Sequence, residues 1–203
     1  MVERLLRSSR LPIESALLDT PVLSIHGARQ SGKSALAQAV AALHGHHYLT
    51  FDEGRHPAAA REDPIGFVER LDERVVLDEV QRVPELILPL KAKIDRDRHP
   101  GRFILTGSAD WLRMPALSDS LAGRVEALRL GPLAQLEIEG HASGNTLLDR
   151  LFAQAPLIGS GSPRRGGSPI RRLLAGGFPS ALFSNKDFRY MVEHARLRSA
   201  FPL

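Results

Sequence analysis

The chain has 203 residues, 43% of them hydrophobic and 25% charged, which is enough for one generous domain or for one domain with part of another. It contains no cysteine, so disulfides and cysteine metal sites are excluded. The first residues lack a signal-peptide core, and no apolar run approaches the roughly 20 residues of a membrane span. We therefore expect a cytoplasmic protein with no membrane partner.

The net charge of +4 is concentrated towards the end of the chain. Residues 1–140 carry 18 Lys and Arg against 20 Asp and Glu, whereas residues 141–203 carry 9 against 3. A basic tail is compatible with binding to nucleic acid or to an acidic partner. Arginine outnumbers lysine 23 to 4 in the whole chain, which favours a compositional origin, and the few aromatic residues provide no stacking platform for bases.

The first 140 residues predict strands that alternate with helices. The expected elements are a helix over 2–18 interrupted near Pro12, strands at 22–25, 46–51, 74–79, 102–106 and 125–130, helices at 35–43, 65–71, 85–98 and 117–122, and a polar loop at 53–64. This alternation predicts an α/β fold with a parallel sheet covered by helices on both faces.

The remaining residues predict less structure. Short helices are expected at 147–154, 170–175 and 187–199, around a linker at 156–169 that is rich in glycine, serine and proline. This region has too little apolar material for a core of its own. We therefore expect one domain over 1–140 and a linker with an incomplete helical region over 141–203.

The first strand and the first long helix are joined by a phosphate-binding loop. The segment from Gly27 to Ser34 matches the pattern G-x-x-x-x-G-K-[ST]. Its glycines allow a close approach of backbone N–H groups to a polyphosphate, Lys33 would reach the β- and γ-phosphates, and the Ser34 hydroxyl would bind Mg²⁺. The predicted nucleotide-binding residues are Gly27, Ala28, Arg29, Gln30, Ser31, Gly32, Lys33, Ser34 and Ala35.

Polar side chains follow the third and fourth predicted strands at the edge of the sheet where such folds bind ligands. Asp78 is suited to hold Mg²⁺, and the adjacent Glu79 is suited to act as general base towards water. A hydroxyl of Thr106 or Ser108 is suited to contact the γ-phosphate or the attacking water. The structural alternative for Asp78 and Glu79 is a solvated strand end. The alternative for Thr106 and Ser108 is a helix cap or turn.

Four segments carry a family resemblance: Gly27 to Ser34, Val76 to Pro84, Pro100 to Ser108, and Leu117 to Val125. In this order they resemble the bacterial and archaeal ATP-binding proteins of the AAA+ superfamily, whose AAA-like domain precedes a C-terminal domain of unknown function. The resemblance implies an ASCE-type P-loop sheet with strand order 5-1-4-3-2 and a preference for ATP over GTP. It also implies that Arg124 acts on the γ-phosphate, either within the chain or across a subunit interface; a salt bridge is the alternative.

The resemblance extends to Gly176-Gly177-Phe178-Pro179, which is similar to the motif that opens the C-terminal region of the family. Members of the family continue well beyond this point, so we expect a truncated C-terminal region here. Asp52, at the end of the second predicted strand, is a weaker site candidate. His46 and His47 are adjacent on a strand and face opposite ways, so a metal site shared with His44 is not expected.

These residues predict a Mg²⁺-dependent ATPase that couples ATP hydrolysis to movement of an attached or partner domain. The predicted catalytic residues are Lys33, Glu79, Thr106, Ser108 and Arg124, and the predicted metal ligands are Ser34 and Asp78. The alternatives are a nucleotide switch or decayed ATPase that does not hydrolyse ATP, a P-loop kinase that uses a carboxylate such as Asp52, and a DNA-binding ATPase. A homo-oligomer and a protein client both remain open.

Overall fold

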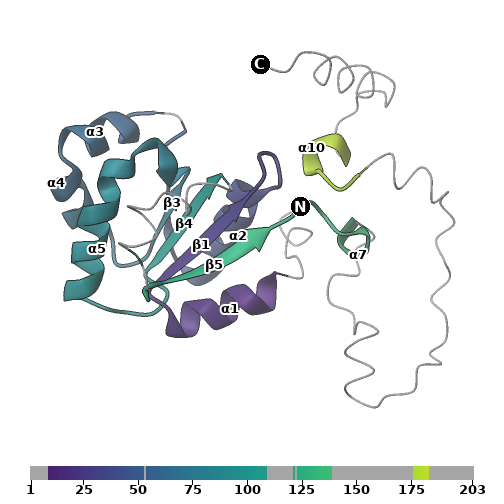
Figure 1. Cartoon of the computed structure of the whole chain (residues 1–203), viewed down its shortest axis with the longest axis horizontal. Coiled ribbons are helices and arrows are strands. Elements are labelled where there is room, and N and C mark those ends of the chain that lie inside the picture. Colours follow the sequence, from purple (N-terminus) through teal and green to yellow (C-terminus); the bar gives the residue numbers. More distant parts are fainter. Residues whose placement is uncertain (1–8, 53, 109–120, 122, 139–175, 183–203) are drawn as a thin grey trace, which may run out of the picture. The chain divides into compact units, whose positions relative to one another are not determined.

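A five-stranded sheet organises the computed structural model, which describes residues 9–52, 54–108, 121, 123–138 and 176–182 (Figure 1). The strands are β1 (Val22–Gly27), β2 (His47–Thr50), β3 (Val75–Asp78), β4 (Phe103–Ser108) and β5 (Val125–Leu130). The helices are α1 (Arg10–Asp19), α2 (Lys33–His44), α3 (His56–Glu62), α4 (Pro64–Glu69), α5 (Ile87–Arg96), α7 (Gln135–Ile138) and α10 (Pro179–Leu182).

All pairs of neighbouring strands are parallel, and their order is β2-β3-β4-β1-β5. This confirms the α/β fold and the predicted strand order. In the register of the sheet, Gly27 pairs with Ser108, and Thr50 pairs with Asp78. The carboxyl ends of the four strands β1 to β4 therefore meet at one edge of the sheet.

Two apolar clusters cover the two faces of the sheet, because strand residues alternate between faces. Leu23 and Ile25 of β1 pack with α1 and α2, whereas Val75 and Leu77 of β3 pack with α3, α4 and α5. Figure 1 shows these two groups of helices on opposite sides of the sheet. The buried strand β3 is apolar on successive residues for this reason.

Three helices differ from the predicted elements. The segment expected to be a polar loop contains α3, which has Pro57 in its first turn followed by three alanines; proline in a first turn and alanine in a helix are both favourable. Pro12 does not interrupt α1 but lies in its first turn, where backbone N–H groups have no partner within the helix. Two 3₁₀ turns, Val80–Arg82 and Pro84–Leu86, precede α5.

Contacts divide the chain into a unit of residues 1–131 and a unit of residues 132–203. In the second unit the Leu133 N–H donates to the Gly177 carbonyl at 2.7 Å. A Cβ atom at Gly177 would lie 2.3 Å from the Leu133 carbonyl oxygen, so this position of the Gly-Gly-Phe-Pro segment requires glycine. The boundary near residue 140 stays a prediction.

Several predicted elements, namely the helices at 147–154, 170–175 and 187–199 and the linker at 156–169, lie outside the described residues, as does nearly all of the helix at 117–122. In the described part of the chain, no helix has the length and apolar character needed to cross a membrane.

Candidate nucleotide-binding site

The loop between β1 and α2 favours glycine at two positions, and the physical reason differs between them. Gly32 has a φ of +92° and Gln30 a φ of +62°, so the loop turns through left-handed conformations just before α2 begins. At Gly27, by contrast, space is limiting, because a Cβ atom there would lie 2.2 Å from the Leu130 carbonyl oxygen of β5. The loop is thus held closely against the neighbouring strand.

The Lys33 side chain lies within this loop. It is 5% exposed, and its ammonium group donates to the carbonyl oxygens of Gly27 at 3.2 Å and Ala28 at 3.0 Å. Ser34 and Ala35 follow in the first turn of α2, where backbone N–H groups point out of the helix. The ammonium group of Lys33 and the N-terminus of α2 therefore lie close together, an arrangement that favours binding of a polyphosphate.

The carboxylate of Asp78 lies at the end of β3 and is only 3% exposed. The Thr106 hydroxyl donates to its Oδ1 at 2.5 Å, and the Tyr48 hydroxyl donates to its Oδ2 at 2.7 Å. Thr50 makes a longer contact of 3.4 Å with Oδ2. Hydrogen bonds from hydroxyl groups thus hold both oxygens of a buried carboxylate, which compensates part of its lost hydration.

Glu79 departs from the strand conformation immediately after Asp78. Its φ of +60° is left-handed, which is uncommon for a residue other than glycine. The Glu79 N–H donates to the Thr106 hydroxyl at 3.0 Å, and the Gln81 amide donates to the Glu79 carboxylate. The two adjacent carboxylates therefore have separate partners.

Thr106 and Ser108, the two hydroxyl candidates on β4, differ in their surroundings. Thr106 is fully buried, and its hydroxyl both donates to Asp78 and accepts from the Glu79 N–H. These contacts orient the two acidic residues, and a contact of Thr106 with phosphate or water stays a prediction. Ser108 is half-buried and pairs with Gly27 at the start of the loop, so a contact with phosphate stays a prediction for Ser108.

Arg124 is not at this edge of the sheet. It directly precedes β5, and its carbonyl accepts from the N–H of Val22 at the start of β1. The six residues of β1 separate this amino edge from the loop by about 20 Å. The Arg124 side chain donates to Asp95 at 2.5 Å, and this hydrogen bond lowers the pKa of Asp95. The length of the strand thus separates Arg124 from the loop of its own chain, and its contact with a γ-phosphate stays a prediction.

The remaining candidates have separate partners. Asp52 forms an ion pair with Arg82. His44 accepts from Arg74 through its backbone carbonyl. His46 contacts the Gly101 carbonyl, and His47 contacts Asp72, each at 2.8 Å. Within the described ranges, no three side chains of the metal-binding types come together.

Tyr48 is the residue of this site that sequence reasoning missed. Burial, followed by hydrogen bonding to Asp78, raises the pKa of its hydroxyl, while the nearby Gln38 and Ser34 side chains act in the opposite direction. Tyr48 thus links β2 to the end of β3 and to α2. The period of the strand places Tyr48 on the same face as Thr50, but only the register against β3 reveals its contact with Asp78.

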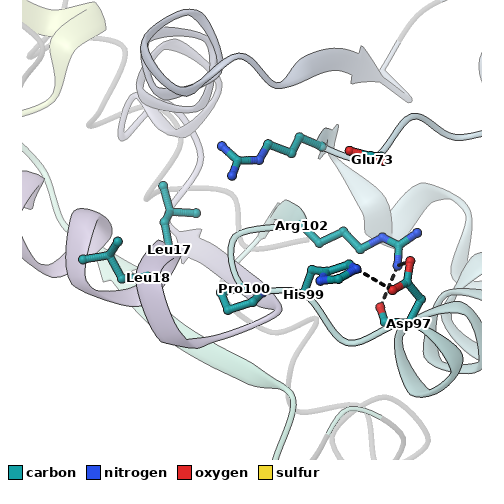
Figure 2. A pocket seen from close by; sticks show the side chains of 8 residues that line it. Leu17, Leu18, Glu73, Asp97, His99, Pro100 and Arg102 are labelled. Atoms are coloured by element: carbon teal, nitrogen blue, oxygen red, sulfur yellow. Dashed lines mark hydrogen bonds and ion pairs between the residues drawn. The ribbon is translucent and has the colours of Figure 1, made fainter.

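A hollow of about 540 Å³ lies elsewhere, at the amino edge of the sheet (Figure 2). Leu17 and Leu18 of α1 form one side of it. Arg102, which precedes β4, is buried and is held by the carboxylate and the carbonyl oxygen of Asp97, and His99 contacts the same carboxylate. The strand ends that carry the loop and Asp78 lie at the opposite edge, so this hollow is separate from the predicted phosphate site.

A parallel sheet with this strand order and a glycine loop leading into a helix defines a P-loop nucleotide-binding domain of the AAA-like NTPase class. The sequence profile of the AAA domain family matches residues 19–139. The chain therefore belongs to the AAA domain family.

The chain is 33% identical over 158 residues to the uncharacterized protein Rv2008c of Mycobacterium tuberculosis, a match that covers 77% of this chain and 34% of that protein. The chain thus spans about a third of the length of this relative. Among solved structures, it is similar to the Walker-type ATPase PABY2304 of Pyrococcus abyssi (19% identity, 96% and 75% of the two chains, TM-score 0.48). It is also similar to AMPPCP-bound DnaA of Aquifex aeolicus (13%, 94% and 61%, TM-score 0.46).

Proposed function

We propose that this chain binds ATP together with Mg²⁺ and hydrolyses it to ADP and phosphate. The observation that carries this proposal is the buried carboxylate of Asp78, which both Thr106 and Tyr48 orient at the same sheet edge as the phosphate-binding loop. A buried carboxylate is costly to maintain, so its retention beside a cationic loop favours a role in binding a metal–nucleotide complex.

The donor set fits Mg²⁺. Ser34 offers a hydroxyl oxygen at the start of α2 and Asp78 a carboxylate, and hard oxygen ligands of this kind suit Mg²⁺, which retains several waters. When bound, the ion would neutralise charge on the β- and γ-phosphate oxygens. Lys33 and the N–H groups from Gly27 to Ala35 would bind the same phosphates.

The remaining residues would act on the attacking water. Glu79 would accept its proton while the bond between the γ-phosphorus and the ADP oxygen breaks. The Thr106 hydroxyl, which holds both Asp78 and the Glu79 N–H, would keep the metal ligand and the base in a fixed relative position. Ser108 would contact the γ-phosphate, and Arg124 would act only on nucleotide bound by a second copy of the chain.

Phosphate release by the purified chain, with ATP and Mg²⁺, tests this proposal. Glu79→Gln is expected to lower the rate by about 10²- to 10⁴-fold, because it removes the base.

Lys33→Ala is expected to weaken ATP binding about 10- to 100-fold, since a charged hydrogen-bond donor to phosphate is lost. The control variants Glu85→Gln and Lys91→Ala change the same residue types outside the site and should retain both properties. Unchanged ATP binding by Lys33→Ala would refute the phosphate site.

A second candidate is a nucleotide switch that binds ATP without turnover. It is favoured by the Gln81 amide, which already engages the Glu79 carboxylate and would have to release it for proton transfer. The two functions differ in one measurement. If Gln81→Ala and the unaltered chain both bind ATP but release no phosphate, the chain is a switch. We also propose that either function is coupled to a further domain, and the greater length of the relative supports this proposal.

A further inference from the structure

Tyr48 brings a phenol hydroxyl to the carboxylate that would hold Mg²⁺. It donates to Asp78 Oδ2 at 2.7 Å. Its ring is half-buried and packs against the apolar cluster between the sheet and α2, which holds the hydroxyl in place. One side chain thus reaches the predicted metal ligand Asp78 from a neighbouring strand, while its ring packs against the cluster that α2 contributes to.

We infer that Tyr48 is a positioning residue of the Mg²⁺ site, an inference that rests on the proposed function. The Thr106 hydroxyl holds Oδ1 of Asp78 and the Tyr48 hydroxyl holds Oδ2, so the carboxylate cannot rotate. Its remaining lone pairs are directed by these two bonds. Hydrogen-bond partners that orient a metal ligand in this way typically contribute 10- to 100-fold to metal affinity.

Tyr48 is better placed for this role than its neighbour on the same strand face. Thr50 also approaches Asp78 Oδ2, but at 3.4 Å, which is long for a hydrogen bond between oxygens. Thr50 therefore provides a matched control: the same carboxylate oxygen is approached from the same strand, without a short hydrogen bond. A general effect of disturbing β2 would appear in both variants, whereas a positioning effect would appear in Tyr48→Phe alone.

The test compares the affinity of a fluorescent ATP analogue with and without Mg²⁺, measured on the full chain. In the wild-type chain Mg²⁺ is expected to increase the affinity. In Tyr48→Phe this increase should fall about tenfold, because only the orienting hydroxyl is lost, while the affinity without Mg²⁺ changes less than twofold. Thr50→Val should retain most of the wild-type increase.

A double-mutant cycle with Asp78→Asn identifies the route of the effect. If Tyr48 acts through Asp78, Tyr48→Phe should not reduce the Mg²⁺-dependent increase further in the Asp78→Asn background. An equal loss of affinity with and without Mg²⁺, or a Tyr48→Phe chain with the wild-type increase, would overturn the inference. A wild-type chain that binds the analogue without any effect of Mg²⁺ would overturn the proposed function itself, which distinguishes the two failures.

Discussion

At the scale of single residues, the site depends on a hydroxyl that serves two partners. Thr106 is fully buried, donates to Asp78 and accepts from the Glu79 N–H, so one side chain sets the geometry of two consecutive acidic residues. The left-handed backbone of Glu79 makes this support necessary, since that conformation is unfavourable for a residue with a side chain. The hydrogen bonds of Thr106 and the unfavourable backbone conformation of Glu79 therefore occur together, directly after β3.

Replacing Thr106 by valine tests this reading, because the two side chains have nearly the same shape. Thr106→Val should lower the free energy of unfolding by about 1–3 kcal/mol, since it leaves a buried carboxylate oxygen and a backbone N–H without their partner. It should also slow phosphate release and reduce the Mg²⁺-dependent increase in ATP affinity, while leaving the ATP affinity without Mg²⁺ nearly unchanged. Urea unfolding and nucleotide titration measure these effects.

Thr106→Ser is the matched control, because it retains the hydroxyl and loses only a methyl group. It should retain most of the activity. If Thr106→Val instead weakened ATP binding in the absence of Mg²⁺ without loss of stability, the hydroxyl would contact phosphate directly, and its assignment to Asp78 and Glu79 would be wrong.

At the scale of secondary-structure elements, α4 shows how a very short helix is stabilised by its surroundings. Six residues are too few for a helix that is stable alone. The Asp63 side chain accepts from the Gly66 N–H at 2.8 Å at its beginning. At its end, the buried ammonium group of Lys93 from α5 donates to the carbonyl oxygens of Val68 at 2.7 Å, Glu69 at 3.2 Å and Leu71 at 3.0 Å.

Lys93→Met should therefore destabilise the fold by about 1–3 kcal/mol, because it removes the common donor to three carbonyl groups that are partly or fully shielded from water. Lys91→Met, two residues earlier on the same helix and more exposed, should change the free energy of unfolding by less than about 0.5 kcal/mol. Urea unfolding followed by circular dichroism compares the two. Equal effects would show that the ammonium group of Lys93 contributes little beyond its aliphatic stem.

At the scale of the whole molecule, the buried His46 and the half-buried His26 couple stability to pH. Burial is the main cause that lowers the pKa of His46 and of His26, with Arg129 adding to the effect at His26. The folded chain therefore binds these protons at lower pH than the unfolded chain, in which the pKa is about 6.5. Because the unfolded state binds more protons in this window, stability rises with pH.

We expect the free energy of unfolding to decrease as the pH falls from about 7 through 6.5 towards the lowered pKa values, by at most about 1.4 kcal/mol per pH unit for each histidine. His46→Gln retains an amide that can donate to the Gly101 carbonyl, and it should reduce this slope. His56→Gln, at an exposed position on α3, should leave the slope unchanged. Urea unfolding at several pH values measures it, and equal slopes in all three chains would contradict the assignment.

Most of the sheet and of the phosphate-binding loop could be predicted from the sequence. Successive apolar residues indicated β3, and the glycine and lysine spacing indicated the loop, because both patterns are local. The helix α3 was missed because His56, Pro57 and the surrounding charges suggested a loop, although three alanines follow. The hydrogen bonds of Thr106 and Tyr48 could not be predicted, since they join residues that are 28 and 30 positions away from Asp78.

The sequence by itself therefore determined the kind of ligand site and the strands that carry it, because phosphate binding by a glycine loop requires a short, contiguous set of residues. The tertiary structure alone decided which side chains act together. It placed Arg124 at the amino edge beside Asp95, joined Thr106 to Asp78 and Glu79, and brought Tyr48 to the predicted metal ligand Asp78. The physical reason is that parallel register, which no local pattern specifies, decides which strand ends meet.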